Sequence, residues 1–360
     1  MAAYAGWRRN LLRLLRILGA VLAWLVVSLL LVWGAAALWF DVRTGWLKYV
    51  AAAVYALALL ASLFLIKRSA LRLAACMACF LAVLCWWLSL EPSNTRDWQP
   101  DVSRTAWAEV HADHVVIHDV RNCDYRAEHD FTCRWETRSY DLSQLRGSDV
   151  FIVYWGSPWI AHTIVSFEFA NSDPIAFSIE TRKVTGQSYS ALLGFFRQYT
   201  LIYIASDERD VVRLRTNYRH GAAGQGEDVY LYHLRADPLR ARARFLEYIQ
   251  RINELHAHPE WYNALTKNCT TSIFAQREAT PGAVPALSEW DWRVLLNGKL
   301  DGMAYERGAF AGNLPFDELK RRAYINPVAR AAGDDPAFSR IIREGRPGFE
   351  DLQEEAAPDR

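Results

Sequence analysis

Cys269 is the residue whose type and position most directly suggest covalent chemistry. It follows Asn268, a good helix N-cap, and precedes Thr270 and Thr271. A cysteine in the first turn of a helix lies at the positive end of the helix dipole, which lowers the pKa of the thiol and favours the nucleophilic thiolate. The alternative is a buried structural cysteine, the commoner fate of a lone Cys. The sequence predicts a nucleophile here and leaves that alternative open.

His162 is the natural base for such a thiol. It opens the predicted strand 163–169, and a turn folds the next strand, 175–181, back against it. This hairpin brings Glu180 or Arg182 beside His162. Glu180 can accept the imidazole N–H and orient the base, as the third member of a Cys–His–acid arrangement. The alternative is that both are ordinary solvated strand residues.

The elements that must position these residues change in type along the chain. Short runs that alternate apolar and polar residues predict strands between residues 111 and 234. They are residues 115–117, 150–155, 163–169, 175–181, 201–205, 211–214 and 229–234. After residue 234 the pattern is helical, with Asp237 and Pro238 as a helix start followed by apolar residues at helical spacing. Strands followed by helices predict an α+β domain.

Three apolar runs precede this domain, at residues 17–40, 49–66 and 73–90. Each is long enough for a helix that spans a bilayer core about 30 Å thick. The runs predict a membrane anchor over residues 1–90, followed by a linker at 91–106, a domain at 107–345 and an acidic disordered tail at 346–360.

The placement of basic residues predicts the orientation of the anchor. Seven Lys and Arg residues lie before the first run or between the second and third, whereas only Arg43 and Lys48 lie between the first and second. We therefore expect a cytoplasmic N-terminus and a domain in the periplasm of a bacterial inner-membrane protein. Trp86 and Trp87 fit an aromatic belt at the end of the third span.

The cysteines divide between these two regions. Cys76, Cys79 and Cys85 lie inside the third apolar run and are expected to be small apolar side chains. Cys123 and Cys133 lie ten residues apart in what we expect to be an oxidising compartment, so we predict a disulfide between them. Cys269 then remains as a free thiol.

Composition and motifs exclude several classes of function. The net charge is +1, without the basic excess of a nucleic-acid-binding protein. The sequence holds no metalloprotease, P-loop, dinucleotide-binding or serine-hydrolase motif. We expect no metal, no cofactor and no nucleic-acid partner.

Five stretches resemble the Lnb-type periplasmic domain family. They are residues 154–162 (YWGSPWIAH), 176–182 (AFSIETR), 207–219, 261–271 (WYNALTKNCTT) and 290–293. The resemblance covers about residues 107–316, and the chain departs from the family pattern at Cys123 and Cys133. The family is similar to permuted papain-like (NlpC/P60-like) thiol enzymes, in which the His strand precedes the Cys helix. This chain has that order.

The resemblance implies a lipoprotein N-acyltransferase with Cys269 as nucleophile and His162 as base. We expect ping-pong transfer of an acyl chain from a phospholipid to the N-terminal amine of a lipoprotein, with Glu180 as third member. Tyr154 is a candidate for stabilising the oxyanion, and Arg182 and Asn268 are candidates for binding substrate.

Two alternatives remain at this stage. A cysteine amidase or peptidase of the cell wall would need a polar groove open to the wall. A membrane-tethered scaffold without activity would hold Cys269 and His162 beyond hydrogen-bonding distance.

The predicted orientation can be tested by fusing alkaline phosphatase to truncated chains. Fusions after Leu90 should be active, because the enzyme folds only when exported, and fusions at Arg68 should be inactive. The reverse pattern would show that the topology is inverted.

Overall fold

The computed structural model describes residues 2–219, 227–235, 238–264, 266, 293 and 297–350. The chain forms two compact units. The helical unit comprises Met1–Pro92 and the short segment Leu192–Gln198, and the sheet unit comprises Ser93–Ala191 and Tyr199–Arg360.

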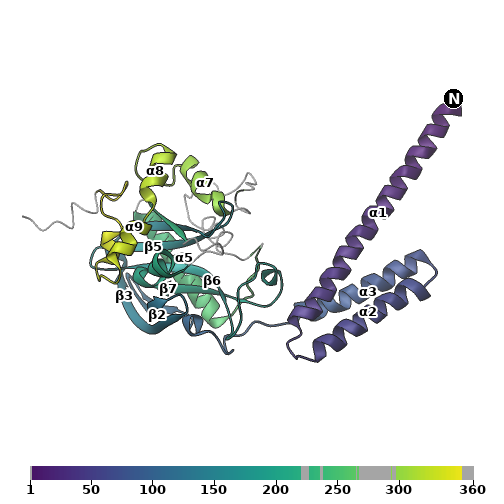
Figure 1. Cartoon of the computed structure of the whole chain (residues 1–360), viewed down its shortest axis with the longest axis horizontal. Helices are drawn as coiled ribbons and strands as arrows, with labels where there is room; N and C mark the ends of the chain where they lie inside the picture. Colours follow the sequence, from purple (N-terminus) through teal and green to yellow (C-terminus); the bar gives the residue numbers. More distant parts are fainter. Residues whose placement is uncertain are drawn as a thin grey trace, which may run out of the picture. The chain divides into compact units, whose positions relative to one another are not determined.

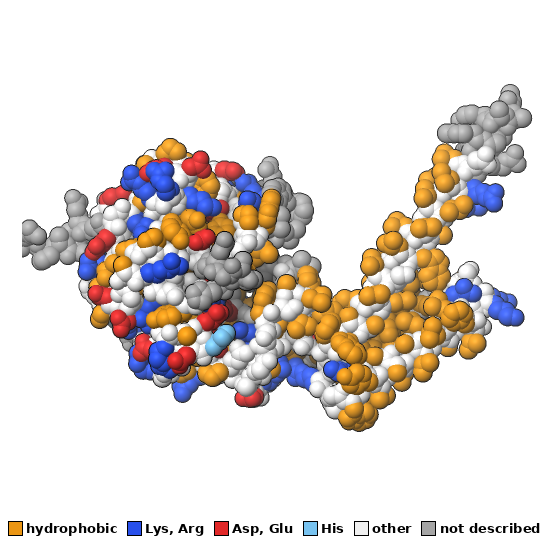
Figure 2. Space-filling view, in the orientation of Figure 1, with side chains coloured by type: hydrophobic (Ala, Val, Ile, Leu, Met, Phe, Trp, Pro, Cys, Tyr) orange, Lys and Arg blue, Asp and Glu red, His pale blue; other side chains and the backbone are white. Residues whose placement is uncertain are grey.

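The helical unit contains α1 (Ala2–Asp41), α2 (Leu47–Leu65) and α3 (Ser69–Leu88) (Figure 1). Each helix is long and apolar enough to cross a membrane. Most of their apolar side chains face outward, and Figure 2 shows these helices covered with hydrophobic groups. Such a surface suits lipid better than water, so the predicted membrane anchor of three helices is confirmed.

The sheet unit is built on one eight-stranded sheet in the order β1-β2-β7-β6-β5-β4-β8, with β3 paired to β2. The pairs are antiparallel except for a parallel contact between β2 and β7. The strands are β1 (Trp107–His111), β2 (His114–Ala127), β3 (Asp130–Asp141), β4 (Leu145–Tyr154), β5 (Ala161–Phe169), β6 (Ser172–Arg182), β7 (Thr200–Ser206) and β8 (Asp228–His233).

Helices pack on both faces of this sheet. They are α4 (Glu208–Arg213), η4 (Leu214–Tyr218), α5 (Pro238–Ala257), α7 (Leu300–Glu306), α8 (Phe316–Ala323), α9 (Asn326–Ala332) and α10 (Phe338–Ile341). Short 3-10 turns are η1 (Pro100–Val102), η2 (Leu142–Gln144), η3 (Leu193–Phe195) and η6 (Asn297–Lys299). The predicted α+β class is confirmed. The permuted papain-like arrangement stays a prediction, because the expected Cys helix lies outside the described residues.

Alternation along the strands divides the core between the two faces. On one face, Phe167 and Phe177 pack against Phe245 and Tyr248 of α5. On the other, Phe151, Val153 and Ile164 pack with residues of α4, α9 and α10. We call this second face the His162 face, because it carries His162. The helix predicted after residue 237 is confirmed as α5.

One predicted strand is wrong. Residues 211–214 form the end of α4 and the start of η4, although Val211 and Val212 favour strands. Asp207 caps the helix, since its carboxylate accepts a hydrogen bond from the backbone N of Arg209 at 2.8 Å. Both valines are fully buried against the His162 face, so tertiary packing outweighs their intrinsic preference.

The segments predicted as linker and tail contribute to the sheet unit. Trp98 and Val102, from the predicted linker, pack on Ile202 and Ile204 of β7. Phe349, from the predicted tail, is buried in the core of the His162 face. Residues 351–360 lie outside the described residues.

The predicted disulfide between Cys123 and Cys133 is confirmed. The two cysteines are direct cross-strand partners in β2 and β3, which continue beyond them to Ala127 and from Asp130. Most of the residues between the two cysteines are therefore paired strand.

Removing this disulfide should weaken the sheet unit. We expect Cys123→Ser combined with Cys133→Ser to lower the free energy of unfolding by about 3 kcal/mol, because the disulfide-closed loop reduces the conformational entropy of the unfolded chain. Urea unfolding of the full chain in detergent, with and without reductant, measures this. Reductant should destabilise the wild type but not the variant, and equal stability of the two proteins would contradict the prediction.

Candidate active site

His162 lies at the start of β5, where Val153 of β4 is its cross-strand partner. Its imidazole Nε2 is 2.8 Å from the hydroxyl of Ser178 on β6. That hydroxyl donates to Oε1 of Glu180 at 2.8 Å, and Glu180 Oε1 is itself 3.8 Å from His162 Nε2. The hairpin therefore brings Glu180 beside His162, with Ser178 as the bridge between them.

These contacts determine which ring nitrogen carries the proton. A serine hydroxyl has a single proton, and Ser178 gives it to the carboxylate of Glu180. Ser178 can then only accept from the imidazole, so His162 Nε2 must be the N–H donor. In the neutral ring Nδ1 then carries the lone pair. His162 is thus held in the tautomer that presents Nδ1 as the base.

Arg215 stabilises the charge at the far end of this chain of hydrogen bonds. It lies on the π-helix η4, is 1% exposed, and donates to Glu180 Oε1 at 2.6 Å and to the carbonyl of Val211 at 2.7 Å. Burial raises the pKa of Glu180, but the positive charges of Arg215 and Arg219 outweigh it and hold that pKa well below its usual value. Glu180 is therefore an ionised acceptor at neutral pH.

The same surroundings keep His162 neutral. Burial, followed by the positive charge of Arg215, lowers the pKa of His162 to about 3, although Glu180 acts in the opposite direction. The imidazole is therefore unprotonated at neutral pH, in an orientation set by its contact with Ser178.

Two of the predicted site residues, Cys269 and Asn268, lie outside the described residues. Two others have surroundings that the sequence did not predict. Arg182 does not extend toward His162: it donates to the carbonyls of Val102 and Ser103 and lies over the ring of Trp98. These contacts fix the segment before β1 rather than form part of the His162 network.

Tyr154 lies on the face of the sheet opposite His162. It pairs with Ala161, the residue before His162, and neighbouring strand residues point to opposite faces. Its hydroxyl donates to the carbonyl of Gly298 at 3.1 Å, and its ring lines a cavity of about 580 Å³ with Asp301 and Lys320. The Tyr154 hydroxyl thus lies on the other side of the sheet from His162, and its role at an oxyanion stays a prediction.

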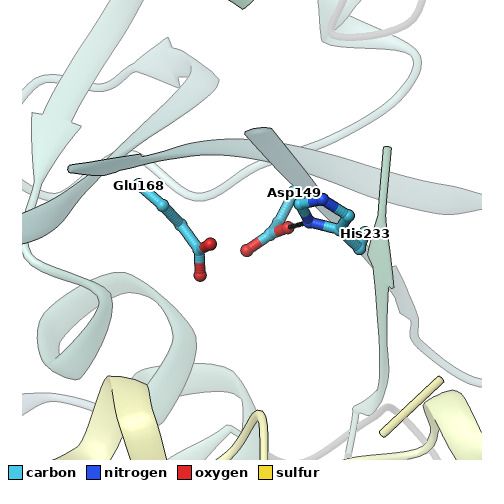
Figure 3. Close-up of side chains that lie close together, drawn as sticks. All are labelled: Asp149, Glu168 and His233. Atoms are coloured by element: carbon cyan, nitrogen blue, oxygen red, sulfur yellow. Dashed lines mark hydrogen bonds and ion pairs between the residues drawn. The ribbon is translucent and has the colours of Figure 1, made fainter. Parts of the chain in front are cut away.

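A second polar cluster lies at the other end of the His162 face. Asp149, Glu168 and His233 come from three neighbouring strands and point toward one another (Figure 3). His233 Nδ1 lies 2.7 Å from Asp149 Oδ1. Their ligand atoms lie within 4.8 Å of one another, a spacing that can hold a metal ion.

The guanidinium of Arg343 is bonded to these same carboxylates. It donates to Asp149 Oδ2 at 2.7 Å, to both oxygens of Glu208 and to Glu168. Arg343 thus occupies the position that a metal ion bound by these carboxylates would take. Burial and the nearby charge of Asp149 raise the pKa of Glu168 to about 8, which limits the net negative charge of the cluster. The arrangement is that of a buried ion cluster that fixes the C-terminal segment to the sheet.

Sequence reasoning missed the cationic members of both clusters. Arg215 and Arg343 lie 35 and 194 residues from the carboxylates that they pair with, Glu180 and Asp149. No local spacing rule relates such distant positions. Strand alternation alone also does not indicate that Ser178 bridges His162 and Glu180.

A three-helix apolar anchor joined to an α+β unit defines a membrane protein with one folded extramembrane domain. Residues 131–298 match the model of the Lnb N-terminal periplasmic domain family, so this region is similar to that family, in agreement with the resemblance of its motifs. The chain matches no curated protein and no solved structure. The family and the three helices together make this a membrane protein with a periplasmic domain, while the direction of its N-terminus stays a prediction.

The depressed pKa of His162 has a measurable effect on stability. Below pH 6.5 the unfolded state binds a proton at this imidazole that the folded state binds only near pH 3, so stability falls as the pH is lowered through that window. His162→Gln cannot titrate and keeps a donor for Ser178. As the pH is lowered from 6.5 to 4.5, we expect the free energy of unfolding of this variant to fall less steeply than that of the wild type. The two slopes should differ by up to about 1.4 kcal/mol per pH unit.

Urea unfolding of the full chain in detergent at a series of pH values measures the slopes. His111→Gln is the matched control, because the side chain of His111 is 70% exposed. The prediction fails if His162→Gln and the wild type show the same slope.

Proposed function

We propose that this protein is a periplasmic thiol acyltransferase, anchored in the membrane, that moves an acyl chain from a phospholipid to an amine. The observation that carries the proposal is the chain of contacts from His162 through Ser178 to Glu180 and Arg215. A neutral histidine with a fixed tautomer has a lone pair available for the proton of a thiol nucleophile. The match to the Lnb family supports Cys269 as that nucleophile, by the motif that contains it.

In the first half-reaction, His162 Nδ1 takes the proton of the Cys269 thiol. The thiolate attacks the ester carbonyl of the phospholipid, and a C–S bond forms as the C–O bond breaks. His162 returns the proton to the departing alkoxide, which leaves as a lysophospholipid. Cys269 then carries the acyl chain as a thioester.

In the second half-reaction, an amine attacks the thioester carbonyl and passes its proton to His162. The C–S bond breaks, the amide forms, and the proton returns to the thiolate. The N-terminal cysteine of a lipoprotein is the proposed acceptor, because the family resemblance implies it and because both substrates then belong to the same membrane as the three-helix anchor.

The loop that precedes His162 supports an apolar substrate. Trp159 and Ile160 are 49% and 47% exposed, and the ring of Trp155 lies 6.5 Å from that of His162. Exposed apolar side chains beside a catalytic base are more useful for an acyl chain than for a polysaccharide or a charged peptide.

The proposal predicts a thioester on Cys269. Incubation of the full-length protein with a phospholipid of defined acyl chains, without acceptor, should give a hydroxylamine-sensitive mass increase on the peptide that contains Cys269. Cys269→Ala should show none, and His162→Ala should form it about 100-fold more slowly because the base is lost. Glu180→Gln should lower the rate less, since it affects only the orientation of the imidazole.

His111→Ala is the matched control and should react at the wild-type rate. Addition of a peptide with a diacylated N-terminal cysteine should yield the N-acyl peptide. Release of free fatty acid alone would instead establish a hydrolase, and a fully active Cys269→Ala protein would rule out every thiol mechanism.

A further inference from the structure

The segment Leu192–Gln198, between β6 and β7 in sequence, belongs to the helical unit. Its centre, Phe196, is 5% exposed and is part of the apolar core of the three helices. The Phe196 ring lies 5.0 Å from that of Phe40 and 6.4 Å from that of Trp33, measured between centroids. A loop between two strands of the sheet unit is thus packed into the membrane anchor.

Polar contacts fix this segment at one end of the helices. The carboxylate of Asp41, which is 3% exposed, accepts hydrogen bonds from Gln198 Nε2 at 2.6 Å and from Trp87 Nε1 at 2.7 Å. The Arg197 guanidinium lies 4.3 Å from the Trp87 ring and donates to the carbonyl of Leu88 at 3.2 Å. These contacts satisfy a buried charge and the last carbonyls of α3, so the position of the segment is well determined.

The contacts also show at which height along the helix axes the segment Leu192–Gln198 lies. Asp41 is the last residue of α1 and Leu88 the last of α3. Trp33 lies eight residues before Asp41, or about 12 Å along the helix axis. Phe196 therefore reaches past the helix ends to the apolar part of the spans, while Arg197 stays at their ends. Arginine and tryptophan at helix ends are typical of the bilayer interface.

The two large apolar residues beside Phe196 are exposed. Leu192 is 59% exposed and Phe195 38% exposed. In water each would lack part of the stabilisation that burial of such a side chain contributes. The helices of the same unit also expose apolar side chains, for example Leu29 of α1, which is 63% exposed on a helix apolar enough to span a membrane. Phe196 packs on Phe40 and Trp33 of α1, so the exposed side chains beside it lie close to the apolar helices of the anchor.

We infer that Leu192–Gln198 is a membrane-embedded segment, with Leu192 and Phe195 in contact with phospholipid at the same boundary at which α1 and α3 end. The chain is then held in the bilayer by four elements rather than by three helices alone. The lipid-contacting segment joins β6, the strand of Ser178 and Glu180, to β7. This inference does not depend on the proposed chemistry.

Site-specific labelling of the full-length protein in vesicles of phosphatidylethanolamine and phosphatidylglycerol tests it. In a background in which Cys76, Cys79, Cys85 and Cys269 are replaced by Ser, single cysteines are introduced as Leu192→Cys and Phe195→Cys and labelled with a fluorophore. Leu29→Cys on α1 is the lipid-facing control, and His111→Cys on β1 is the aqueous control.

Phospholipid that carries a nitroxide in its acyl chain should quench the label at positions 192, 195 and 29 and leave position 111 bright. Iodide in the buffer should quench only position 111. Iodide quenching at 192 and 195 would show that the segment is in water, and protection from both quenchers would show that protein covers it. Either result overturns the inference without bearing on Cys269.

Discussion

A carboxylate stays ionised inside a protein only if an opposite charge lies next to it, and Glu180 meets that condition through Arg215. The orientation of His162 depends on this pair. If Glu180 were protonated, it could donate to Ser178, the hydroxyl of Ser178 would turn, and the imidazole would lose its fixed tautomer. The charge of Arg215 also helps to keep His162 neutral. The ion pair thus determines the direction of the proposed base, whereas burial is the largest cause of its lowered pKa.

The helix that supplies Arg215 also supplies Glu208, so α4 and η4 connect the two polar clusters of the His162 face. Glu208 at the start of α4 binds Arg343, whereas Arg215 in η4 binds Glu180. Between them, Val211 and Val212 pack on the sheet. Asp210 fixes the register of this helix, because it accepts two hydrogen bonds from Arg121 of β2 at 2.9 and 2.8 Å. A shift of the helix would disrupt both clusters together.

The parts of this arrangement that depend on local pattern could be predicted from the sequence. Strand alternation and a single turn were sufficient to predict that Glu180 lies beside His162. The spacing of Cys123 and Cys133 was sufficient to predict their disulfide. The cationic partners could not be predicted, because tertiary packing brings them from distant segments. The same packing makes residues 211–214 helical, where a strand was expected. Tyr154 lies on the face of the sheet opposite His162.

The two clusters of the His162 face differ in what they leave available for chemistry. In the Arg343 cluster the guanidinium satisfies three carboxylates, and Asp149 also binds His233, so its main charged groups are already paired. Such a cluster stabilises structure through contacts that are costly to break singly. Among the residues that the structure describes, the contacts of the His162 cluster end at Nε2, and their geometry requires the lone pair of the neutral ring to be on Nδ1. Nδ1 of His162 is therefore unprotonated and lies outside the hydrogen bonds of the network, as expected of a general base. This difference separates the candidate active site from the structural cluster on the same face.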